Sequence, residues 1–488
     1  MAGGPLDDIF AAAGQTPRGP QAEALRDGLR ALLMLAGRKA VAEHLSGALP
    51  DYLTALLDER ISAQVNAILH HADFLALEAA WRGLRFLVDR LDFSQNIKLE
   101  YLNISKDDLV ADFEDAPEVV KSGLYKHIYT DEFGQFGGQP VAAVIADYIF
   151  TPSARDIRLL KHVSSVASLA HAPFFAAAGE EFFDLDDWSR FADIKDLKSL
   201  FDMPGYARWN SFRETETARY IGLSLPGFLL RPSYDQETAG SAAFNFTEIP
   251  ENERQFCWGN TAFALAVCLA DSFAKYRWCV NIIGPDGGGA LTSLPHCQYV
   301  AMRGIQNKIP TRTAISEHRE YELAELGFIA LVADRKPNEA VFFSANSALK
   351  PKLFPKTPEG AAAEINFRLS TQFPYMMLMN RIAHYIKVLQ RESVGARRSR
   401  EDIARELNAW ISRYVTAMDT PDALTRSRRP LRMAHIDVKE IEGNSGWYAV
   451  SIQVRPHFKY MGANFTLSLE GRLEKEPLIT TVSSASAT

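Results

Sequence analysis

The sequence predicts a mixed α/β fold with partly parallel sheets and covering helices, and three observations lead to it. Apolar runs at Val141–Phe150 and Pro173–Ala178 flank a segment with helical periodicity. The stretch Thr261–Ala270 has no polar face, which is typical of a helix buried inside a domain. From Ile436 onward apolar and polar residues alternate, which indicates half-buried antiparallel strands.

The segment from residue 97 to residue 178 alternates strand and helix signals. Ile97–Ile104 is strand-like, and Ser105 with Asp108 predicts a capped helix start. Ser153 predicts the start of a second helix, which separates the two apolar runs at 141–150 and 173–178. Strand, crossover helix and strand form a βαβ unit, so we expect part of this sheet to be parallel.

The buried helix is followed by Cys279–Ile283, a short apolar run that ends at Gly-Pro and predicts a buried strand. The next residues, Gly284–Ala290, are rich in glycine but contain neither Gly-Lys-Ser/Thr nor Gly-x-Gly-x-x-Gly. Pro285 has no N–H to donate, and Asp286 places negative charge where a phosphate would bind. We therefore predict a tight turn where two chain segments pass closely, and no phosphate site.

Helical periodicity marks several further segments. Leu77, Trp81, Leu84, Val88 and Leu91 recur at steps of four and three along a helix opened by Asp73. A long helix from Leu369 to Leu389 is expected to bend near Pro374, and another helix starts at Ser399. The remaining expected elements are strands at Thr313–Ile315, Phe328–Val332 and Ala340–Phe343, with a helix at Ser316–Leu326.

The C-terminal region predicts a small antiparallel meander. Ile436 and Val438 begin the first strand pattern, and Glu442–Gly446 turns the chain. The second and third strand patterns are carried by Tyr448, Val450, Ile452 and Val454, and then by Phe465, Leu467 and Leu469. A terminal meander has edge strands, and pairing with another chain is one way to satisfy them. These residues are candidates for strands that pair with another subunit.

The N-terminal segment Pro5–Ala13 predicts a short amphipathic helix that places Leu6, Ile9 and Phe10 on one face. A helix of this length is not stable alone in water. Two interpretations stand side by side at this point: a frayed terminus, or a peptide that becomes helical in the groove of a partner.

Composition and charge limit the function classes. The 488 residues, 47% hydrophobic and 23% charged, are typical of a soluble globular protein of two to four domains of about 100–200 residues each. A net charge of −7 argues against general nucleic-acid binding. The four cysteines form no CxxC pair and are expected to be reduced core residues of a cytoplasmic protein. No signal peptide opens the sequence, and no apolar run is long enough to span a membrane.

No catalytic or metal-binding pattern stands out. HExxH and GxSxG are absent, and no Cys–His or paired-carboxylate signature is present. Asp147, Glu180 and Glu181 lie at strand ends, where α/β proteins often bind ligands, but a solvated surface explains them equally well. His70 and His71 lack a third ligand at metal-binding spacing and are expected at the surface or as capping residues. The sequence therefore favours an interaction protein without cofactor or metal over an enzyme.

Six dispersed segments share one resemblance. They are AAWRGL (Ala79–Leu84), AHAPF (Ala170–Phe174), WNSFRETE (Trp209–Glu216), WGNTAF (Trp258–Phe263), RIAHYIKV (Arg381–Val388) and VRPHF (Val454–Phe458). In sequence and in order they resemble the large subunit of the type VI secretion contractile sheath, the TssC/VipB family. The resemblance covers roughly residues 61–473, residues 1–60 match only in general pattern, and the tail after Glu474 matches nothing.

The resemblance implies a contractile tail-sheath-like fold and a cytoplasmic structural protein that is not an enzyme and needs no cofactor. Its implied partners are a small sheath subunit of the TssB/VipA type, further copies of the chain in a helical polymer, an inner Hcp tube, a baseplate and a ClpV-type AAA+ unfoldase. Nucleic acid and direct membrane insertion are not implied. The unfoldase would grip an N-terminal helix, for which Leu6–Ala13 is the best match and residues 21–36 the next.

The expected domains follow from these patterns. Residues 1–60 form a helical region with the unfoldase-recognition segment, and 61–255 form an α/β sheath domain. Residues 256–430 form a second α/β domain around the buried helix, and 431–488 form the meander and tail for strand exchange. Two other functions remain open: an α/β enzyme with a dispersed active site, and the sheath of an extracellular phage-tail-like particle.

Overall fold

The structure is a computed structural model of the chain. It describes residues 24, 27–28, 30–31, 34, 49–133, 137–235, 244, 246–301, 304–352, 354–392, 400–418, 421–440, 448–457 and 467–472. The chain forms two compact units: residues 1–78 with 232–256, and residues 79–231 with 257–488. The described part of the first unit contains α3 (Leu49–Leu69) and the beginning of α4 (Ala72–Arg90). Pro50 lies in the first turn of α3, where its missing N–H has no partner to lose.

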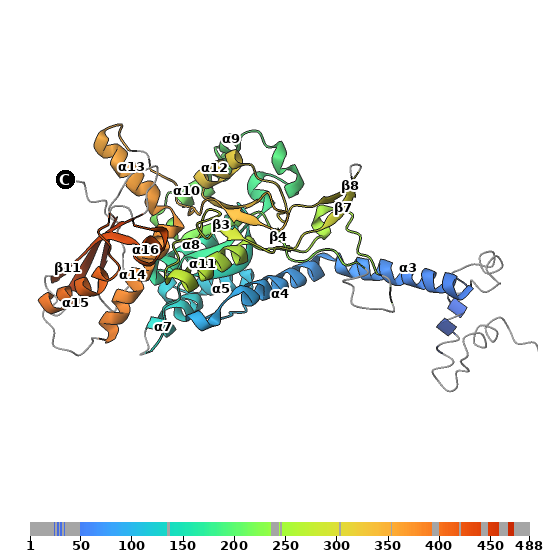
Figure 1. The fold of residues 1–488 in the computed structure, drawn as a ribbon, viewed down its shortest axis with the longest axis horizontal. Helices are drawn as coiled ribbons and strands as arrows, with labels where there is room; N and C mark the ends of the chain where they lie inside the picture. Colours follow the sequence, from blue (N-terminus) through green and yellow to red (C-terminus); the bar gives the residue numbers. More distant parts are fainter. Residues whose placement is uncertain are drawn as a thin grey trace, which may run out of the picture. The chain divides into compact units, whose positions relative to one another are not determined.

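The second unit is built on a six-stranded sheet with the order β1-β2-β3-β9-β10-β6 (Figure 1). Its strands are β1 (Val144–Phe150), β2 (Phe174–Ala178), β3 (Ile221–Leu225), β6 (Ala290–Leu291), β9 (Phe328–Ala333) and β10 (Ala340–Phe342). The first four in this order are parallel, and β9, β10 and β6 pair antiparallel. The expected mixed α/β fold is confirmed. The expected division between residues 255 and 256 falls between β3 and β9 of this one sheet.

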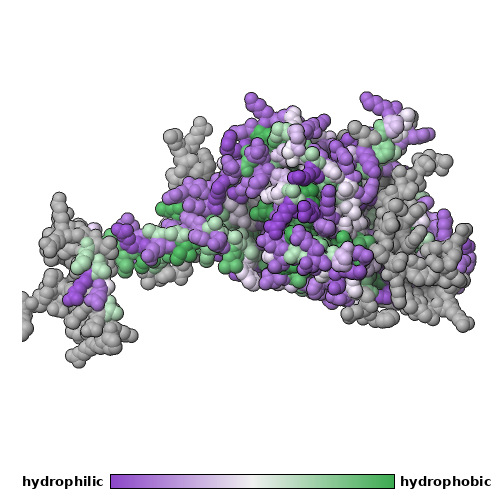
Figure 2. Space-filling model, turned by 180° about the vertical axis from the view of Figure 1, so that it is seen from behind, coloured by the Kyte–Doolittle hydropathy of each residue, from purple (hydrophilic) through white to green (hydrophobic). Residues whose placement is uncertain are grey.

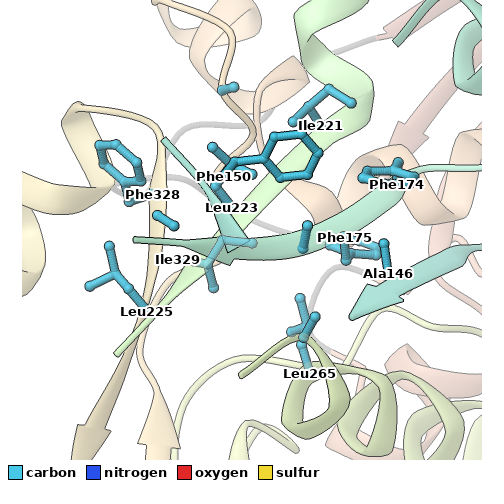
Figure 3. Close-up of a cluster of buried hydrophobic side chains, with 14 of the residues drawn as sticks. Ala146, Phe150, Phe174, Phe175, Ile221, Leu223, Leu225, Leu265, Phe328 and Ile329 are labelled. Atoms are coloured by element: carbon cyan, nitrogen blue, oxygen red, sulfur yellow. The ribbon is translucent and has the colours of Figure 1, made fainter. Parts of the chain in front are cut away.

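The predicted βαβ unit is present as β1, α8 (Ala154–Ala170) and β2. The Ser153 side chain accepts a hydrogen bond from the Asp156 N–H, and His171 ends the helix in the left-handed conformation. Strands β2 and β3 are buried along their whole length, which explains why their sequences show no polar alternation. Figure 3 shows side chains of β1, β2, β3 and β9 meeting in one cluster, with Leu265 lying against it from a helix.

That helix is α11 (Thr261–Tyr276), and most of its first ten residues are buried, as its lack of a polar face predicted. The strand predicted at Cys279–Ile283 is wrong. Val280 and Ile282 are buried, but the Asn281 N–H donates to the Ser272 hydroxyl at 3.1 Å instead of joining a sheet. The apolar residues of this run therefore indicated burial, but they do not form a strand.

The glycine-rich loop after this segment is the tight turn that the sequence predicted. Gly284 N–H donates to the Phe342 carbonyl at 2.7 Å, and Phe342 N–H donates to the Gly289 carbonyl at 2.9 Å. A Cβ at Gly289 would lie 2.6 Å from the Phe342 oxygen, and one at Gly288, where φ is +90°, would lie 2.2 Å from the Asn281 oxygen. Only glycine fits this close passage of one chain segment against another.

A second core lies between the C-terminal helices and a three-stranded sheet. The elements are α13 (Pro358–Ser370), α14 (Phe373–Glu392), α15 (Arg400–Ser412), α16 (Ala423–Arg428), β11 (Leu431–Glu440), β12 (Tyr448–Pro456) and β13 (Leu467–Arg472). The single bent helix predicted around Pro374 is wrong, because the chain leaves helical geometry after Ser370 and starts a new helix at Phe373. Pro374 sits in the first turn of α14, where proline is tolerated.

Two other predicted strands, Ile97–Ile104 and Thr313–Ile315, are absent. The Ile104 carbonyl accepts a hydrogen bond from the Tyr148 hydroxyl at 2.8 Å, and the Thr313 carbonyl accepts one from the Thr311 hydroxyl at 3.0 Å. Side chains therefore satisfy these backbone groups where a neighbouring strand would have done so. The remaining elements are α5 (Lys106–Asp115), α6 (Gly123–Tyr125), a π-helical turn (Lys126–Thr130), α7 (Asp131–Phe133), α9 (Leu197–Phe201), α10 (Ala207–Arg213), α12 (Glu317–Glu325), β4 (Phe228–Leu229), β5 (Trp258–Gly259), β7 (Gln298–Ala301) and β8 (Gly304–Asn307).

Candidate subunit-assembly site

The C-terminal sheet has the order β11-β12-β13, so β12 is its central strand. Val450, Ile452 and Val454 on β12 are buried, and Tyr448 at its start is half-buried. Leu467 and Leu469 lie on β13, in register with Val454 and Ile452. Phe465 lies outside the described residues. Three of the residues expected to join other subunits therefore already serve as core between the sheet and its covering helices.

Groups of the same chain occupy two places on the outer edge of β11, its start and its middle. At its start, Thr416 N–H donates to the Leu431 carbonyl at 2.9 Å, and Leu431 N–H donates to the Tyr414 carbonyl at 3.3 Å. In its middle, the Asn408 side chain of α15 bonds both backbone groups of Ile436. A strand edge with its N–H and C=O groups occupied in this way is a poor template for another strand.

The backbone alternation of antiparallel strands identifies which groups of β13 face outward. Because Ile436 bonds Asn408 with both its N–H and its C=O, its pair with Ile452 on β12 has no ladder bonds. The backbone of Ile452 then faces β13 and bonds Leu469. The next residues on β13, Ser468 and Glu470, consequently present their N–H and C=O groups at the outer edge of the sheet.

The carboxylates named from the sequence do not form a catalytic pair. Glu180 follows β2 and lies 3.7 Å from the Arg312 guanidinium, which is also 3.7 Å from Asp187. Asp147 is exposed on β1, and Glu181 is exposed beside Glu180. Glu180 is thus part of a largely buried ion-pair network, whereas Asp147 and Glu181 lie on the solvated surface.

The prediction for His70 is wrong, whereas the one for His71 is confirmed. The His70 side chain is only 9% exposed, and its Nε2 lies 3.2 Å from Oε1 of the almost fully buried Glu248. Glu248 also accepts a hydrogen bond from the Tyr234 N–H at 3.0 Å, so this pair fixes the segment after Pro232 to the end of α3. His71 is exposed and accepts from the Asp73 N–H at the start of α4. The sequence held no signal for this pair because its members are far apart in the chain.

Burial shapes the environment of several cysteines. Cys257 and Cys268 are buried free thiols, and burial raises the pKa of Cys268 to about 12, far from the range of a reactive thiolate. Burial likewise raises the pKa of Cys279 to about 12. Within the described ranges, no group of three or more His, Cys, Asp or Glu side chains is placed to hold a metal ion.

The N-terminal residues Leu6, Ile9 and Phe10 lie outside the described residues, so their expected role stays a prediction.

Comparison with known proteins gives two family matches. Residues 51–349 match the VipB model, described as the EvpB/VC_A0108 tail sheath N-terminal domain, and residues 362–473 match VipB_2, the tail sheath gpW/gp25-like domain. The chain is also 36% identical over 427 residues to the type VI secretion system sheath protein TssC1 of Pseudomonas aeruginosa, covering 86% of this chain and 85% of that protein. This chain belongs to the VipB family of tail sheath proteins. The resemblance to the TssC/VipB family is thereby confirmed.

Among solved structures, a chain of the anti-feeding prophage baseplate aligns over 81% of the VipB-family chain and 80% of its own length, with 8% identity and a TM-score of 0.32. This structural similarity is too low to support an argument, so the family assignment rests on the sequence comparisons. The six-stranded sheet lies in the first family match, and the sheet β11-β12-β13 lies in the second.

In this VipB-family chain, the first part of the apolar stripe predicted on α4 does not pack on the core, although Leu91 at its end does. Gly83 and Leu87 are buried against Phe263 of α11, whereas Leu77 and Trp81 of the stripe are 58% and 61% exposed. Figure 2 shows apolar residues among the polar ones on the face of the molecule that is turned away in Figure 1. Periodicity identified the helix correctly but did not identify which face the rest of the chain covers.

The VipB-family chain also contains a buried basic cluster on α14, inside the segment Arg381–Val388 that the sequence analysis singled out. Lys387 Nζ lies 5.0 Å from the ring centre of Tyr129 and 5.2 Å from that of Phe133. This ammonium is buried, and no described residue accepts a hydrogen bond from it. Burial lowers the pKa of Lys387 from 10.5 to about 7, because the charged form loses its hydration.

Two histidines and an arginine complete the cluster. His384 Nε2 lies 2.9 Å from the Ala170 carbonyl, and burial lowers the pKa of His384 to about 3. Burial also lowers the pKa of His171, whose ring lies beside that of His384. Arg391 donates to backbone carbonyls of the segment 132–138. Both imidazoles are therefore neutral at pH 7, and they connect α14 to the end of α8 through apolar and hydrogen-bonding contacts.

No described helix is both long enough and apolar enough to cross a membrane.

Proposed function

We propose that this chain is the large subunit of a type VI secretion contractile sheath, which polymerises around an inner tube and contracts to propel it. The observation that carries the proposal is a C-terminal sheet whose β11 edge is occupied within the chain and whose β13 edge presents backbone groups outward. The family assignment and the 36% identity to a type VI secretion sheath protein support it. The chain would act in the cytoplasm and would need no catalytic residue.

The proposed partner at this sheet is a small sheath subunit of the TssB/VipA type. An extended segment that adds to β13 would pair with the outward N–H and C=O groups of Ser468 and Glu470, which gives affinity through main-chain hydrogen bonds. The strands around Val450–Val454 would hold the sheet together in each subunit. Such a link would keep neighbouring heterodimers attached while they slide and rotate during contraction.

The other proposed partners are an Hcp inner tube, a baseplate, further heterodimers in a helical polymer, and a ClpV-type unfoldase. Contraction would draw on free energy stored during assembly, so that the extended sheath is a metastable packing of the same subunits. The unfoldase would recognise Leu6, Ile9 and Phe10 after contraction. A segment this short is expected to bind with modest affinity, which the many copies in a sheath would raise by avidity.

The test of sheath function is co-expression of the chain with a small sheath subunit, followed by electron microscopy for tubes. The β13 edge is tested with the double variant Ser468→Pro and Glu470→Pro, which removes two outward N–H donors without removing a bond to β12. Heterodimers should still form, and tubes should not. The matched control, Ser468→Ala with Glu470→Ala, keeps both N–H groups and should form tubes.

Two outcomes contradict the proposal at different levels. If the unaltered chain forms no tubes with any small sheath subunit, the sheath function is wrong. If the double proline variant forms full-length tubes that contract, strand addition at β13 is wrong although the sheath function stands. Proline at Ile452 would not separate these cases, because the Ile452 backbone pairs with β13 inside the subunit.

The N-terminal proposal is tested by replacing Ile9 and Phe10 with aspartate and measuring binding of an unfoldase N-domain to contracted sheaths. Losing the buried Phe10 side chain alone is expected to cost about 2 kcal/mol, or roughly thirtyfold in affinity. The control places the same two charges at Gln15 and Thr16, outside the apolar face, and should bind normally. Unchanged binding of the Ile9 and Phe10 variant would exclude this segment and leave residues 21–36 as the next candidate.

A further inference from the structure

A strand at the edge of a sheet presents a row of backbone N–H and C=O groups to any chain that can extend alongside it. The sheet β11-β12-β13 has two such edges. A sheath subunit that adds a partner strand at both edges, or at the wrong one, would assemble with the wrong geometry. The difference between the two edges therefore affects assembly as well as stability.

The Asn408 side chain bonds the outward backbone groups of Ile436, in the middle of β11, as a neighbouring strand would. Its Oδ1 accepts a hydrogen bond from the Ile436 N–H at 2.9 Å, and its Nδ2 donates to the Ile436 carbonyl at 2.7 Å. These are the donor and the acceptor that a neighbouring peptide group would supply. A carboxamide carries both on one planar group, so asparagine can satisfy both atoms at once.

The cap is held rigidly on α15. The second Nδ2 proton of Asn408 is directed to the Ala404 carbonyl one turn earlier, at 2.8 Å. The flanking residues Leu407 and Ile411 are buried in the core beneath the sheet. An incoming strand would have to break the bonds to Ile436 and displace a helix that is packed against the sheet.

The segment Tyr414–Thr416 forms backbone hydrogen bonds with the start of β11. Besides its bonds to Leu431, this segment is fixed by His457, whose Nε2 lies 2.9 Å from the Thr416 carbonyl. The His457 N–H in turn donates to the Pro430 carbonyl at 2.9 Å. Two independent parts of the chain therefore occupy the same edge.

We propose that Asn408 is an edge cap that determines where the C-terminal sheet accepts another chain, closing β11 so that an extended segment of a small sheath subunit adds only at β13. The proposal rests on the proposed sheath function for the identity of the partner. It goes beyond that function because it assigns the closure of the middle of β11 to the Asn408 side chain. The occupant of β13 pairs with Ser468 and Glu470, whose backbone groups face outward.

The experiment measures hydrogen exchange of backbone amides in the co-purified heterodimer and in assembled tubes. In the unaltered protein, exchange in the peptide covering 467–472 slows on assembly, and exchange in the peptide covering 434–438 does not change. Gain of protection at 434–438 on assembly would overturn the proposal, because it would place the added strand on β11.

Three variants separate edge capping from ordinary helix packing. Asn408→Ala removes the cap, Asn408→Asp keeps the shape and the acceptor but loses the donors, and Leu407→Ala removes buried packing from the same turn. Ile436 amide exchange in the heterodimer is expected to speed up at least about tenfold in Asn408→Ala and less in Asn408→Asp. In Leu407→Ala the Ile436 amide should change no more than its neighbours in β11.

Self-association of the variants provides the second readout. Asn408→Ala should form irregular assemblies in which 434–438 becomes protected, at lower protein concentration than Leu407→Ala. If the two variants behave alike in exchange and in self-association, Asn408 is only a packing residue and the proposal fails. Both comparisons can be made on soluble heterodimer or chain even if no tubes form, so a failure of the sheath function is distinguishable from a failure of the edge cap.

Discussion

Replacing Lys387 with methionine should stabilise the protein at neutral pH. The Lys387 ammonium is buried between Tyr129 and Phe133 without a hydrogen-bond acceptor among the described residues. Methionine has a similar length and no charge, so it can fill the same space without a desolvation cost. The perturbation therefore removes a destabilising charge while keeping most of the packing.

The magnitude follows from the two pKa values of Lys387. The unfolded chain keeps this lysine protonated up to pH 10.5, whereas the folded protein releases the proton near pH 7. Between these values the unfolded state binds more protons, so the free energy of unfolding rises with pH. At about 1.4 kcal/mol per pH unit, the lysine costs about 4 kcal/mol at pH 7 and about 1 kcal/mol at pH 9.5.

The assay is urea unfolding of the chain purified with its proposed small-subunit partner, followed by tryptophan fluorescence at pH 7 and pH 9.5, with and without the Lys387→Met change. The stabilisation by methionine should shrink by about 3 kcal/mol between the two pH values, because packing differences do not depend on pH and cancel. Lys275→Met is the control, since Lys275 is exposed beside Asp271. A stabilisation that is equal at both pH values, or a loss of stability at pH 7, would refute the reasoning.

Three further predictions concern other parts of the chain. Gly288→Ala should lower the free energy of unfolding by about 2–4 kcal/mol, because φ is +90° and the new Cβ would overlap the Asn281 oxygen. Gly205 has open space around it, so Gly205→Ala should change the unfolding midpoint little. His70→Ala should leave the buried Glu248 carboxylate without this partner and lower the free energy of unfolding by about 2 kcal/mol. Hydrogen exchange in residues 246–250 should become faster. The same change at the exposed His71 is the control, and equal effects of the two changes would contradict the prediction. Expressed without a partner, the full chain should aggregate because of its exposed apolar side chains and the outward backbone groups of β13, and a monodisperse monomer in sedimentation would show this to be wrong.

Local patterns in the sequence predicted the elements whose formation depends on nearby residues. The capped start of α8 at Ser153, the buried strand β2, the buried helix α11 and the glycine turn after it were all predicted correctly. Each depends on periodicity, on a cap within one turn, or on a backbone conformation that only glycine adopts. The family resemblance added the sheath family, which no motif for catalysis or ligand binding would have indicated.

Only the tertiary structure decided what covers each apolar face and which backbone groups remain open. Ile97–Ile104 has the composition of a strand but no neighbouring strand to bond, and the stripe with Trp81 lies on a helix that packs through its other face. The Asn408 cap on Ile436, the His70–Glu248 pair and the aromatic surroundings of Lys387 all join segments that are distant in sequence. A periodic pattern records that a residue is apolar or polar, whereas burial, hydrogen-bond partners and pKa depend on groups that the fold brings from elsewhere.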